Sequence, residues 1–280
     1  MTTESVGCCL ATRPPEPQVA GRGAAVASRS MCGRFVSASP PDQIARYFDA
    51  EAPEAALEPS YNVAPTNDIY VVHVDGTTRR VEPMHWGLVP HWAKDPSIGN
   101  KMINARAETL AEKNAFKSPL AKRRCIIPAN GFYEWLKVPG QKTKQPMFIH
   151  RTDDQPFAFA GLWSVWRDPN ATEAEREAGG GTLRSCTIIT GEPNEKVRTV
   201  HDRMPVMLPH EAWETWLDPA IQDIEMATKL LVPAPADGID IYPVSTEVNS
   251  VRNKGAHLLE RVDPLLAATP GELPGQATLL

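Results

Sequence analysis

The sequence has no long apolar run, no paired cysteine spacing and no excess of positive charge. Its longest apolar stretch, at 156–163, is far shorter than the roughly 20 residues that a membrane-spanning helix needs. The 29 Lys and Arg residues are outnumbered by 34 Asp and Glu, which gives a formal net charge of −5. We therefore expect no membrane partner. We also exclude binding to nucleic acid through net charge alone, so any binding to nucleic acid would have to use a local basic groove.

Cysteine is scarce and irregularly spaced. The five cysteines are an odd count, with no CxxC pair and no zinc-ligand spacing, and they stand at positions 8, 9, 32, 125 and 186. This pattern is typical of a reduced, cytoplasmic protein and predicts no bound metal.

Proline is unusually abundant, at 27 of 280 residues, about twice its usual share. It favours turns and short extended segments over long helices. The composition changes along the chain, because the first thirty residues contain no Trp, Phe or Tyr and are rich in Ala, Gly, Pro and Ser. We predict a disordered leader or start-site artefact over 1–31 that is absent from the active form. An ordered domain over 32–263 and a loose tail over 264–280 follow.

Alternating apolar residues and turn signals predict many strands joined by short helices. Asp75-Gly76 indicates a hairpin turn, Pro40-Pro41 indicates a helix start, and the polar insert at 168–181 indicates an exposed loop or short helix. Strands are expected over 69–74, 81–89, 124–128, 132–138, 146–150, 156–166, 182–190 and 239–245. Helices are expected over 41–50, 106–116, 210–217 and 224–231. The predicted fold class is α+β, a single β-rich domain with short peripheral helices.

Cys32 is the first candidate for chemistry, because a methionine before a small residue, as in Met31-Cys32, is a start that loses its methionine. A free N-terminal cysteine has an α-amine of pKa about 7.7–8.0 beside a thiol of about 8.5, so both nucleophiles are available near neutral pH. The amine can add to an aldehyde to give an imine, and the thiol can then close a five-membered thiazolidine. The alternative is that Cys32 is a small buried hydrophobe at the start of a strand.

Three polar segments are further candidates, each with a structural alternative. Asn104 and Arg106 lie at a strand-to-helix passage, where Asn104 can donate and accept hydrogen bonds and Arg106 can hold a phosphate; the alternative is helix capping with a solvated arginine. Glu134 lies among aromatic residues, which raise a carboxyl pKa and suit a general acid unless the strand face is open to water. His201 stands in a polar triplet between apolar stretches, although a lone histidine more often has a structural role.

Seven short motifs occur in order along the chain, and together they resemble those of the SRAP family, the SOS response-associated peptidase or abasic-site processing proteins. The motifs are MCGRF at 31–35, YNVAPT at 61–66, HWGLVPHW at 85–92, INARAET at 103–109, GFYEW at 131–135, HDRMPV at 201–206 and SVRNKG at 250–255. The resemblance covers about residues 31–260. It implies a SRAP-type fold with a DNA-binding groove. The implied activity is the covalent capture of abasic sites in single-stranded DNA, through a thiazolidine between the N-terminal cysteine and the ring-opened sugar aldehyde, which shields the lesion during the DNA damage response.

The resemblance also implies a role for each matching catalytic residue. Cys32 is the nucleophile, and Asn104 orients the sugar and the cysteine. Glu134 assists proton transfer during ring opening and imine formation, and His201 stabilises or protonates the intermediate.

Binding roles follow in the same way. Arg34 and Arg106 are expected to grip the phosphates flanking the lesion, Trp92 to offer an aromatic surface near the displaced base, and Thr190 to lie just behind the catalytic residues. The expected partner is single-stranded DNA that contains abasic sites, with no cofactor and a monomeric protein. The expected location is the cytoplasm, on the nucleoid during DNA damage if the source is bacterial.

The chain departs from the family pattern at three places. Ala93 stands where a second aromatic residue usually follows the Trp92 position, so a preference for single-strand to duplex junctions is expected to be weaker. Asn114 stands where a phosphate-binding arginine is expected, with Lys113 as a substitute. In addition, a peptide bond joins Cys32 to Met31, so its nitrogen is an amide that cannot form an imine.

Two other functions stay open at this point. A thiol peptidase, acting on itself or on other chains, would use Cys32 as nucleophile and His201 or Glu134 as base. A non-catalytic single-strand binder would use Trp92 and arginine side chains and would bind intact and abasic strands equally.

Overall fold

The computed structural model describes residues 32–178 and 180–265. The leader predicted over 1–31 and nearly all of the tail predicted over 264–280 lie outside the described residues. None of the helices within the described part has the length and apolar character that crossing a membrane requires.

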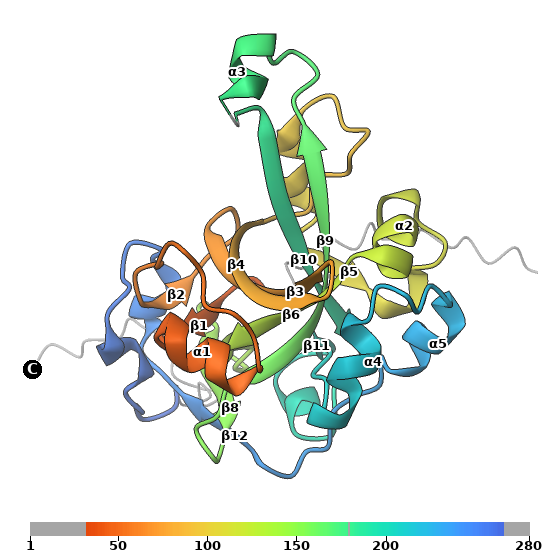
Figure 1. Ribbon diagram of the computed structural model, residues 1–280. Coiled ribbons are helices and arrows are strands. Elements are labelled where there is room, and N and C mark those ends of the chain that lie inside the picture. The colour runs from red at the N-terminus through yellow and green to blue at the C-terminus, as the bar shows by residue number, and fades with distance from the viewer. Residues whose placement is uncertain (1–31, 179, 266–280) are drawn as a thin grey trace, which may run out of the picture. The chain divides into compact units, whose positions relative to one another are not determined.

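Two β-sheets form the framework (Figure 1). The first has the strand order β12-β8-β7-β1-β2, and the second has the order β11-β10-β4-β3-β6-β9. Because β9 also pairs with β10, the strands β10, β4, β3, β6 and β9 close into a ring, and β5 pairs with β10 at its side. The strands are β1 (Phe35–Ser37), β2 (Ser60–Val63), β3 (Asp68–Asp75), β4 (Thr78–Trp86), β5 (Asn104–Arg106), β6 (Arg124–Ala129), β7 (Gly131–Leu136), β8 (Gln145–Arg151), β9 (Phe157–Arg167), β10 (Thr182–Gly191), β11 (Met204–Pro205) and β12 (Ile239–Pro243).

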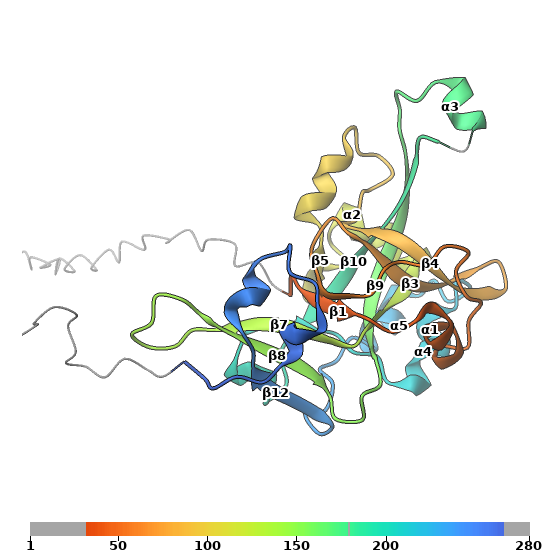
Figure 2. The ribbon, with the colours of Figure 1, turned by 90° about the vertical axis from the view of Figure 1, so that its left-hand side faces the viewer.

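Short helices lie around the sheets. The α-helices are α1 (Pro41–Tyr47), α2 (Asn114–Lys122), α3 (Glu173–Glu177), α4 (Trp213–Leu217) and α5 (Ile224–Lys229). The 3-10 helices are η1 (Pro96–Lys101), η2 (Ala107–Thr109), η3 (Val197–Thr199), η4 (His210–Ala212), η5 (Thr246–Asn249) and η6 (Ala256–Leu259). Strands β9 and β10 extend beyond the ring as a two-stranded arm that ends at α3, as both ribbon views show (Figure 2).

The predicted α+β class and the β-rich architecture are confirmed. The alternating segments predicted as strands correspond to β3, β4, β6 to β10 and β12, and the turn glycine Gly76 has φ +63° as a tight hairpin requires. The helix predicted over 106–116 is wrong. Arg106 is extended because it pairs with Thr190 of β10, and Lys113 is extended as well, so α2 begins only at Asn114.

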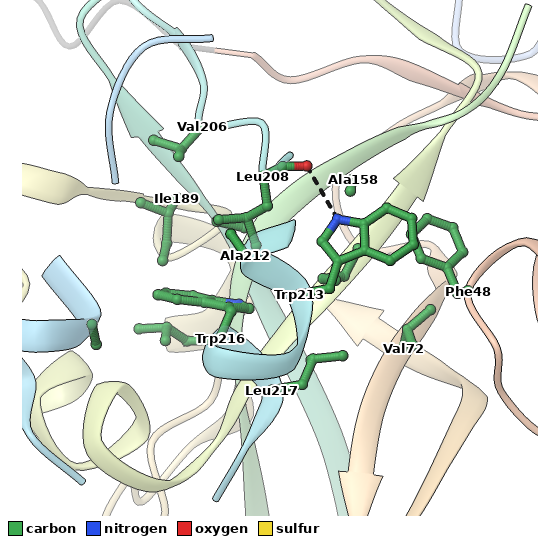
Figure 3. Packing of buried hydrophobic residues seen from close by; sticks show 14 of the residues in the cluster. Phe48, Val72, Ala158, Ile189, Val206, Leu208, Ala212, Trp213, Trp216 and Leu217 are labelled. Carbon is green, nitrogen blue, oxygen red and sulfur yellow. Dashed lines mark hydrogen bonds between the residues drawn. The ribbon is translucent and has the colours of Figure 1, made fainter. Parts of the chain in front are cut away.

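The buried core lies on both faces of β3, because successive strand residues point to opposite sides. Tyr70 and Val72 belong to a cluster that α4 covers with Trp213 and Trp216 (Figure 3), where the indole of Trp213 donates to the carbonyl of Leu208. The residues on the other face, Ile69 and Val71, belong to a second cluster shared with strands of the first sheet. That second cluster includes Cys32, so the candidate nucleophile stands at the edge of a packed core.

Arg124 ties two helices to the ring of strands. Its buried guanidinium donates to the carbonyls of Trp216 (2.5 Å), Leu120 (2.9 Å), Ala121 (3.1 Å) and Asp218 (2.6 Å), which lie at the ends of α4 and α2. Burial lowers the pKa of this group.

The Arg124→Met variant is expected to lower the free energy of unfolding by about 3 kcal/mol or more, because it leaves four carbonyls without their donor. Chemical denaturation measures this loss. Arg46→Met, which removes an exposed arginine of α1 paired with Asp42, is the control and is expected to change stability by less than about 1 kcal/mol. Equal losses in the two variants would contradict the role given to Arg124.

Candidate active site

Strand pairing brings Cys32 to Glu134. β1 and β7 run antiparallel with Phe35 opposite Phe132, and the amide of Tyr133 donates to the carbonyl of Arg34 (3.0 Å). The residues before β1 therefore run alongside the residues after Phe132, which places Cys32 beside Glu134.

Glu134 contacts both the backbone nitrogen and the sulfur of Cys32. Its Oε1 lies 2.9 Å from the backbone nitrogen and 2.8 Å from Sγ. Cys32 is 3% exposed and Glu134 is 2% exposed, so these contacts form away from bulk water. A single carboxylate oxygen thus lies within proton-transfer distance of the thiol, and of the amine that Cys32 would have as the first residue of the chain.

Burial dominates the electrostatics of this pair. It raises the pKa of the Glu134 carboxyl, and the neighbouring His201 and the donors of Cys32 oppose that rise only in part. It also raises the pKa of the Cys32 thiol well above its ordinary value, with a further contribution from the charge of Glu134. The thiol is therefore held protonated, and the sulfur needs a base to become a nucleophile.

His201 lies on the other side of Glu134. Its Nε2 is 3.8 Å from Oε2 of Glu134, and its Nδ1 accepts the backbone N–H of Arg203 at 3.1 Å. A neutral ring whose Nδ1 accepts this bond has its proton on Nε2, which faces Glu134, whereas the other tautomer would donate from Nδ1 to the carbonyl of Arg203 at 3.3 Å. Oδ1 of Asp202 lies 3.2 Å from Nδ1 and can accept a hydrogen bond from the N–H that Nδ1 has in the charged ring.

Arg203 fixes the loop that holds His201. Its guanidinium forms two parallel bonds to the carboxylate of Glu108 (2.7 and 2.9 Å) and donates to the carbonyl of Thr190 (2.7 Å). Its charge also lowers the pKa of Cys32 slightly against the larger effect of burial. Sequence analysis missed both Arg203 and Glu108, although each stands inside a motif, because neither has a local pattern that distinguishes it from a solvated surface residue.

Asn104 joins the same cluster, whereas Arg106 lies at its rim. β5 pairs in parallel with β10, and Nδ2 of Asn104 donates to the carbonyl of Cys32 at 3.4 Å. Arg106, two residues further on, is exposed. Thr190, opposite Arg106 in the pairing, is fully buried behind the site.

Arg34 is placed differently from the other predicted residues, because its guanidinium is engaged by the protein. Nη1 donates to Oδ1 of Asn62 (2.9 Å) and to the carbonyl of Val248 (2.8 Å), and Nη2 donates to the carbonyl of Asn249 (3.4 Å). Asn62 is itself buried, and its amide donates to the carbonyls of Val248, Ser250 and Asn253. Three motifs distant in sequence thus meet at Asn62, which sequence analysis did not single out.

Trp92 lies on the loop between β4 and η1 and is 51% exposed. The next residue, Ala93, is buried, and its carbonyl accepts the indole N–H of Trp166 at 2.7 Å. The loop is therefore anchored at Ala93 while the ring of Trp92 stays accessible.

The site offers acid–base and nucleophilic chemistry. Over the described part of the chain, no group of three or more His, Cys, Asp or Glu side chains is arranged to hold a metal ion. What the geometry provides is a nitrogen, a thiol, a buried carboxyl and an imidazole around Cys32.

Comparison with known proteins gives consistent matches. The family model of the SOS response associated peptidase (SRAP) matches residues 31–251. The abasic site processing protein YoqW of Bacillus subtilis (strain 168) is 46% identical over 232 residues, which cover 82% of this chain and 99% of YoqW. The abasic site processing protein HMCES of Pongo abelii is 34% identical over 273 residues, which cover 83% of this chain and 77% of HMCES.

Solved structures agree with these matches. A phage-related protein from Bordetella bronchiseptica is 30% identical with a TM-score of 0.58, over 76% of this chain and 94% of that one. A protein from Bacteroides thetaiotaomicron, 24% identical, shares the fold with a TM-score of 0.71 over 82% of this chain and 100% of its own. From the length of the family match and the identity of the relatives, the chain belongs to the SOS response associated peptidase family.

Proposed function

We propose that this protein processes abasic sites in DNA, and that it does so by forming a thiazolidine between Cys32 and the ring-opened sugar aldehyde in single-stranded DNA. The observation on which the proposal rests is the contact of one oxygen of Glu134 with both the nitrogen and the sulfur of Cys32. The relatives YoqW and HMCES are named abasic site processing proteins, which supports an abasic site as the substrate.

The reaction joins one aldehyde to one aminothiol and releases one water. The amine of Cys32 adds to the aldehyde carbon, and loss of the hydroxyl as water gives the imine. The thiol sulfur then adds to the imine carbon, and the thiol proton passes to the nitrogen. The sulfur and nitrogen belong to one residue, so ring closure is intramolecular and has the high effective concentration of such reactions.

Glu134 and His201 would move the protons. As a carboxylate, Glu134 can take a proton from the amine or the thiol, and as an acid it can protonate the departing hydroxyl. A pKa raised by burial brings both forms closer to neutral pH, where a general acid–base group works best. His201, in the tautomer or charged form with a proton on Nε2, is positioned to return that proton to the carboxyl or to the intermediate.

The active form in this proposal begins at Cys32. An amide nitrogen cannot become an imine unless its peptide bond is broken, so residues 1–31 must be absent. The family match supports this start, because it begins at residue 31, and YoqW is covered over 99% of its length by a match that takes 82% of this chain.

Exposed groups around the site are proposed to hold the DNA. Arg106 at the rim is available for a phosphate, and Trp92 offers a half-exposed ring for stacking. Arg34 would reach a phosphate from its partly buried position, where Asn62 orients it. Thr190 supports Arg203 through its carbonyl.

The test uses protein whose first residue is Cys32, incubated with single-stranded DNA that contains one abasic site. The expected product is a heat-stable adduct whose mass equals protein plus DNA minus one water. Intact DNA of the same sequence and the Cys32→Ala variant are expected to give none. Equal binding of intact and abasic strands without a covalent product would favour the non-catalytic binder instead.

A second candidate is self-cleavage by the same thiol. Cys32 has φ +31°, a conformation that a residue with a Cβ rarely adopts and that costs of order 1–3 kcal/mol. Attack of Sγ on the carbonyl carbon of the Met31–Cys32 bond would break the C–N bond, pass the proton to the new amine and leave a thioester for water to hydrolyse. The full chain would then lose the mass of residues 1–31, and Cys32→Ser would prevent or greatly slow that loss.

Glu108 is expected to act through Arg203. In Glu108→Gln the guanidinium loses its ionic partner, so the loop that orients His201 loosens, and the rate of adduct formation is expected to fall about tenfold. The ring NMR signals of His201 are expected to move with it, because the orientation of the imidazole changes. Glu112→Gln, at an exposed carboxylate four residues on, is the control; an equal change in both variants would contradict the positioning role.

A further inference from the structure

Two of the seven motifs take no part in the proposed reaction, namely those at 61–66 and 250–255. They meet at Asn62, which is fully buried. Its Nδ2 faces three backbone carbonyls, those of Val248 (3.0 Å), Ser250 (3.0 Å) and Asn253 (2.9 Å). An amide nitrogen has two N–H groups, so three acceptors use its donors completely and leave the amide oxygen to face the other way.

Asn62 lies beside the chain that carries the candidate nucleophile. In the first sheet β1 has β2 on one edge and β7 on the other, and Phe35 of β1 lies opposite Val63 of β2. Residues 32–34 therefore run into β1 with Asn62 on one side and Glu134 on the other. A side chain fixed at Asn62 can thus set the position of a group close to the reacting atoms.

The group that Asn62 holds is a cation without an anionic partner. Nη1 of Arg34 donates to Oδ1 of Asn62 (2.9 Å) and to the carbonyl of Val248 (2.8 Å), and both acceptors are neutral. In the described part of the chain, no carboxylate oxygen lies within 4.0 Å of a nitrogen of Arg34. Burial lowers the pKa of this guanidinium, which is the direction expected when no nearby anion stabilises the charge.

Nη2 is the part of the guanidinium left for a ligand. Among the hydrogen bonds of the described residues it has one, a long contact of 3.4 Å to the carbonyl of Asn249. A guanidinium is planar, so fixing Nη1 also fixes the direction in which Nη2 can donate. Arg34 is therefore held ready for an anion at one edge while its other edge is anchored in the protein.

We propose that Asn62 is a positioning residue for DNA binding: it orients the guanidinium of Arg34 toward a phosphate of the abasic strand and, as a neutral amide, leaves the positive charge to that phosphate. The inference rests on the proposed function for its ligand. An aspartate at position 62 would have nearly the same shape, but it would pair with Arg34 and would lack the donors that hold residues 248–253.

The test measures noncovalent binding of the full chain to an intact single strand of about 15 nucleotides over a range of salt concentrations. Asn62→Asp is expected to weaken binding by about tenfold to 150-fold, as loss of a hydrogen bond to a charged group does. The slope of log K against log salt is expected to become shallower by about 0.7, the value for one phosphate contact of a single strand. Arg34→Gln is expected to have the same two effects.

A double variant separates positioning from a merely structural role. If Asn62 acts through Arg34, Asn62→Asp/Arg34→Gln is expected to bind within about twofold of Arg34→Gln alone, whereas independent effects would multiply. Arg34→Lys keeps the charge but lacks the planar fork that Asn62 orients, so it is expected to bind as weakly as Arg34→Gln.

The matched control is Asn170→Asp, which adds the same charge at an exposed position between β9 and α3 and is expected to bind like the parent. Multiplying effects in the double variant, or unchanged binding by a folded Asn62→Asp, would overturn the inference. If denaturation shows that Asn62→Asp does not fold, Arg34→Lys decides, because affinity equal to that of the parent would show that charge without orientation is enough. The intact strand has no aldehyde, so these results are independent of adduct formation, and the two proposals fail separately.

Discussion

A chain in which Cys32 has any residue on its nitrogen is expected to form no covalent adduct with abasic DNA. The reason is the chemistry of the amide: its lone pair is delocalised into the carbonyl, and forming a C=N bond would require the peptide bond to break. The hydrogen bond from this nitrogen to Glu134 fixes its position but does not free the lone pair, so geometry alone cannot rescue the reaction.

The measurement compares three proteins by denaturing gel and intact mass after incubation with abasic single-stranded DNA. The first begins at Cys32, the second has a single glycine before Cys32, and the third is the 280-residue chain. Only the first is expected to give the adduct. The glycine-extended form is the matched control, because it retains every side chain of the site and differs from the first protein only in the group on the nitrogen of Cys32.

An adduct from the glycine-extended protein that retains its glycine would contradict the thiazolidine and point to another nucleophile. An adduct from the full chain accompanied by the mass loss of residues 1–31 would instead connect the two candidate functions, because self-cleavage would then produce the nucleophile. These outcomes are distinguished by the mass of the protein part of the adduct.

The strands and the reacting groups were predictable because each has a local signal. Alternating apolar residues marked β3, β9 and β10, and aromatic neighbours singled out Glu134 as a carboxyl of raised pKa, which its burial confirms. The helix expected over 106–116 failed because helix-forming composition competed with strand pairing to β10, a long-range interaction that the local sequence does not reveal.

The supporting groups were not predictable for the same reason. Asn62 and Arg203 act through hydrogen bonds to residues far away in sequence, and a polar residue that makes such bonds looks locally like any surface residue. Arg34 shows the converse. The family resemblance assigns it to phosphate contact, whereas the structure shows how much of its guanidinium is used inside the protein, which only the fold can reveal.

Glu134→Gln is expected to slow adduct formation by about 10² to 10⁴-fold at saturating DNA, the usual contribution of a positioned general acid–base group. The glutamine keeps the size of the side chain and can still hydrogen-bond Cys32, but it cannot take or give a proton. Glu82→Gln is the matched control: that carboxylate bonds His73 and Arg184 away from Cys32, so the rate should not change.

The pH profile separates loss of proton transfer from loss of folding. Burial raises the pKa of Glu134, so the carboxylate form is lost at a higher pH than for an ordinary glutamate as the pH falls. The acidic limb of the rate profile should therefore lie above the usual carboxyl range and disappear in Glu134→Gln, while any limb set by the amine stays. Stability has the opposite sign: a raised pKa in the folded state favours the neutral side chain, and that contribution is lost as the pH rises through the raised value. The neutral glutamine keeps this contribution to stability, so the variant should be at least as stable as the parent at neutral pH. A slow but stably folded Glu134→Gln would identify the carboxyl as the group that moves the proton. A rate equal to that of the parent would remove the carboxyl from the mechanism.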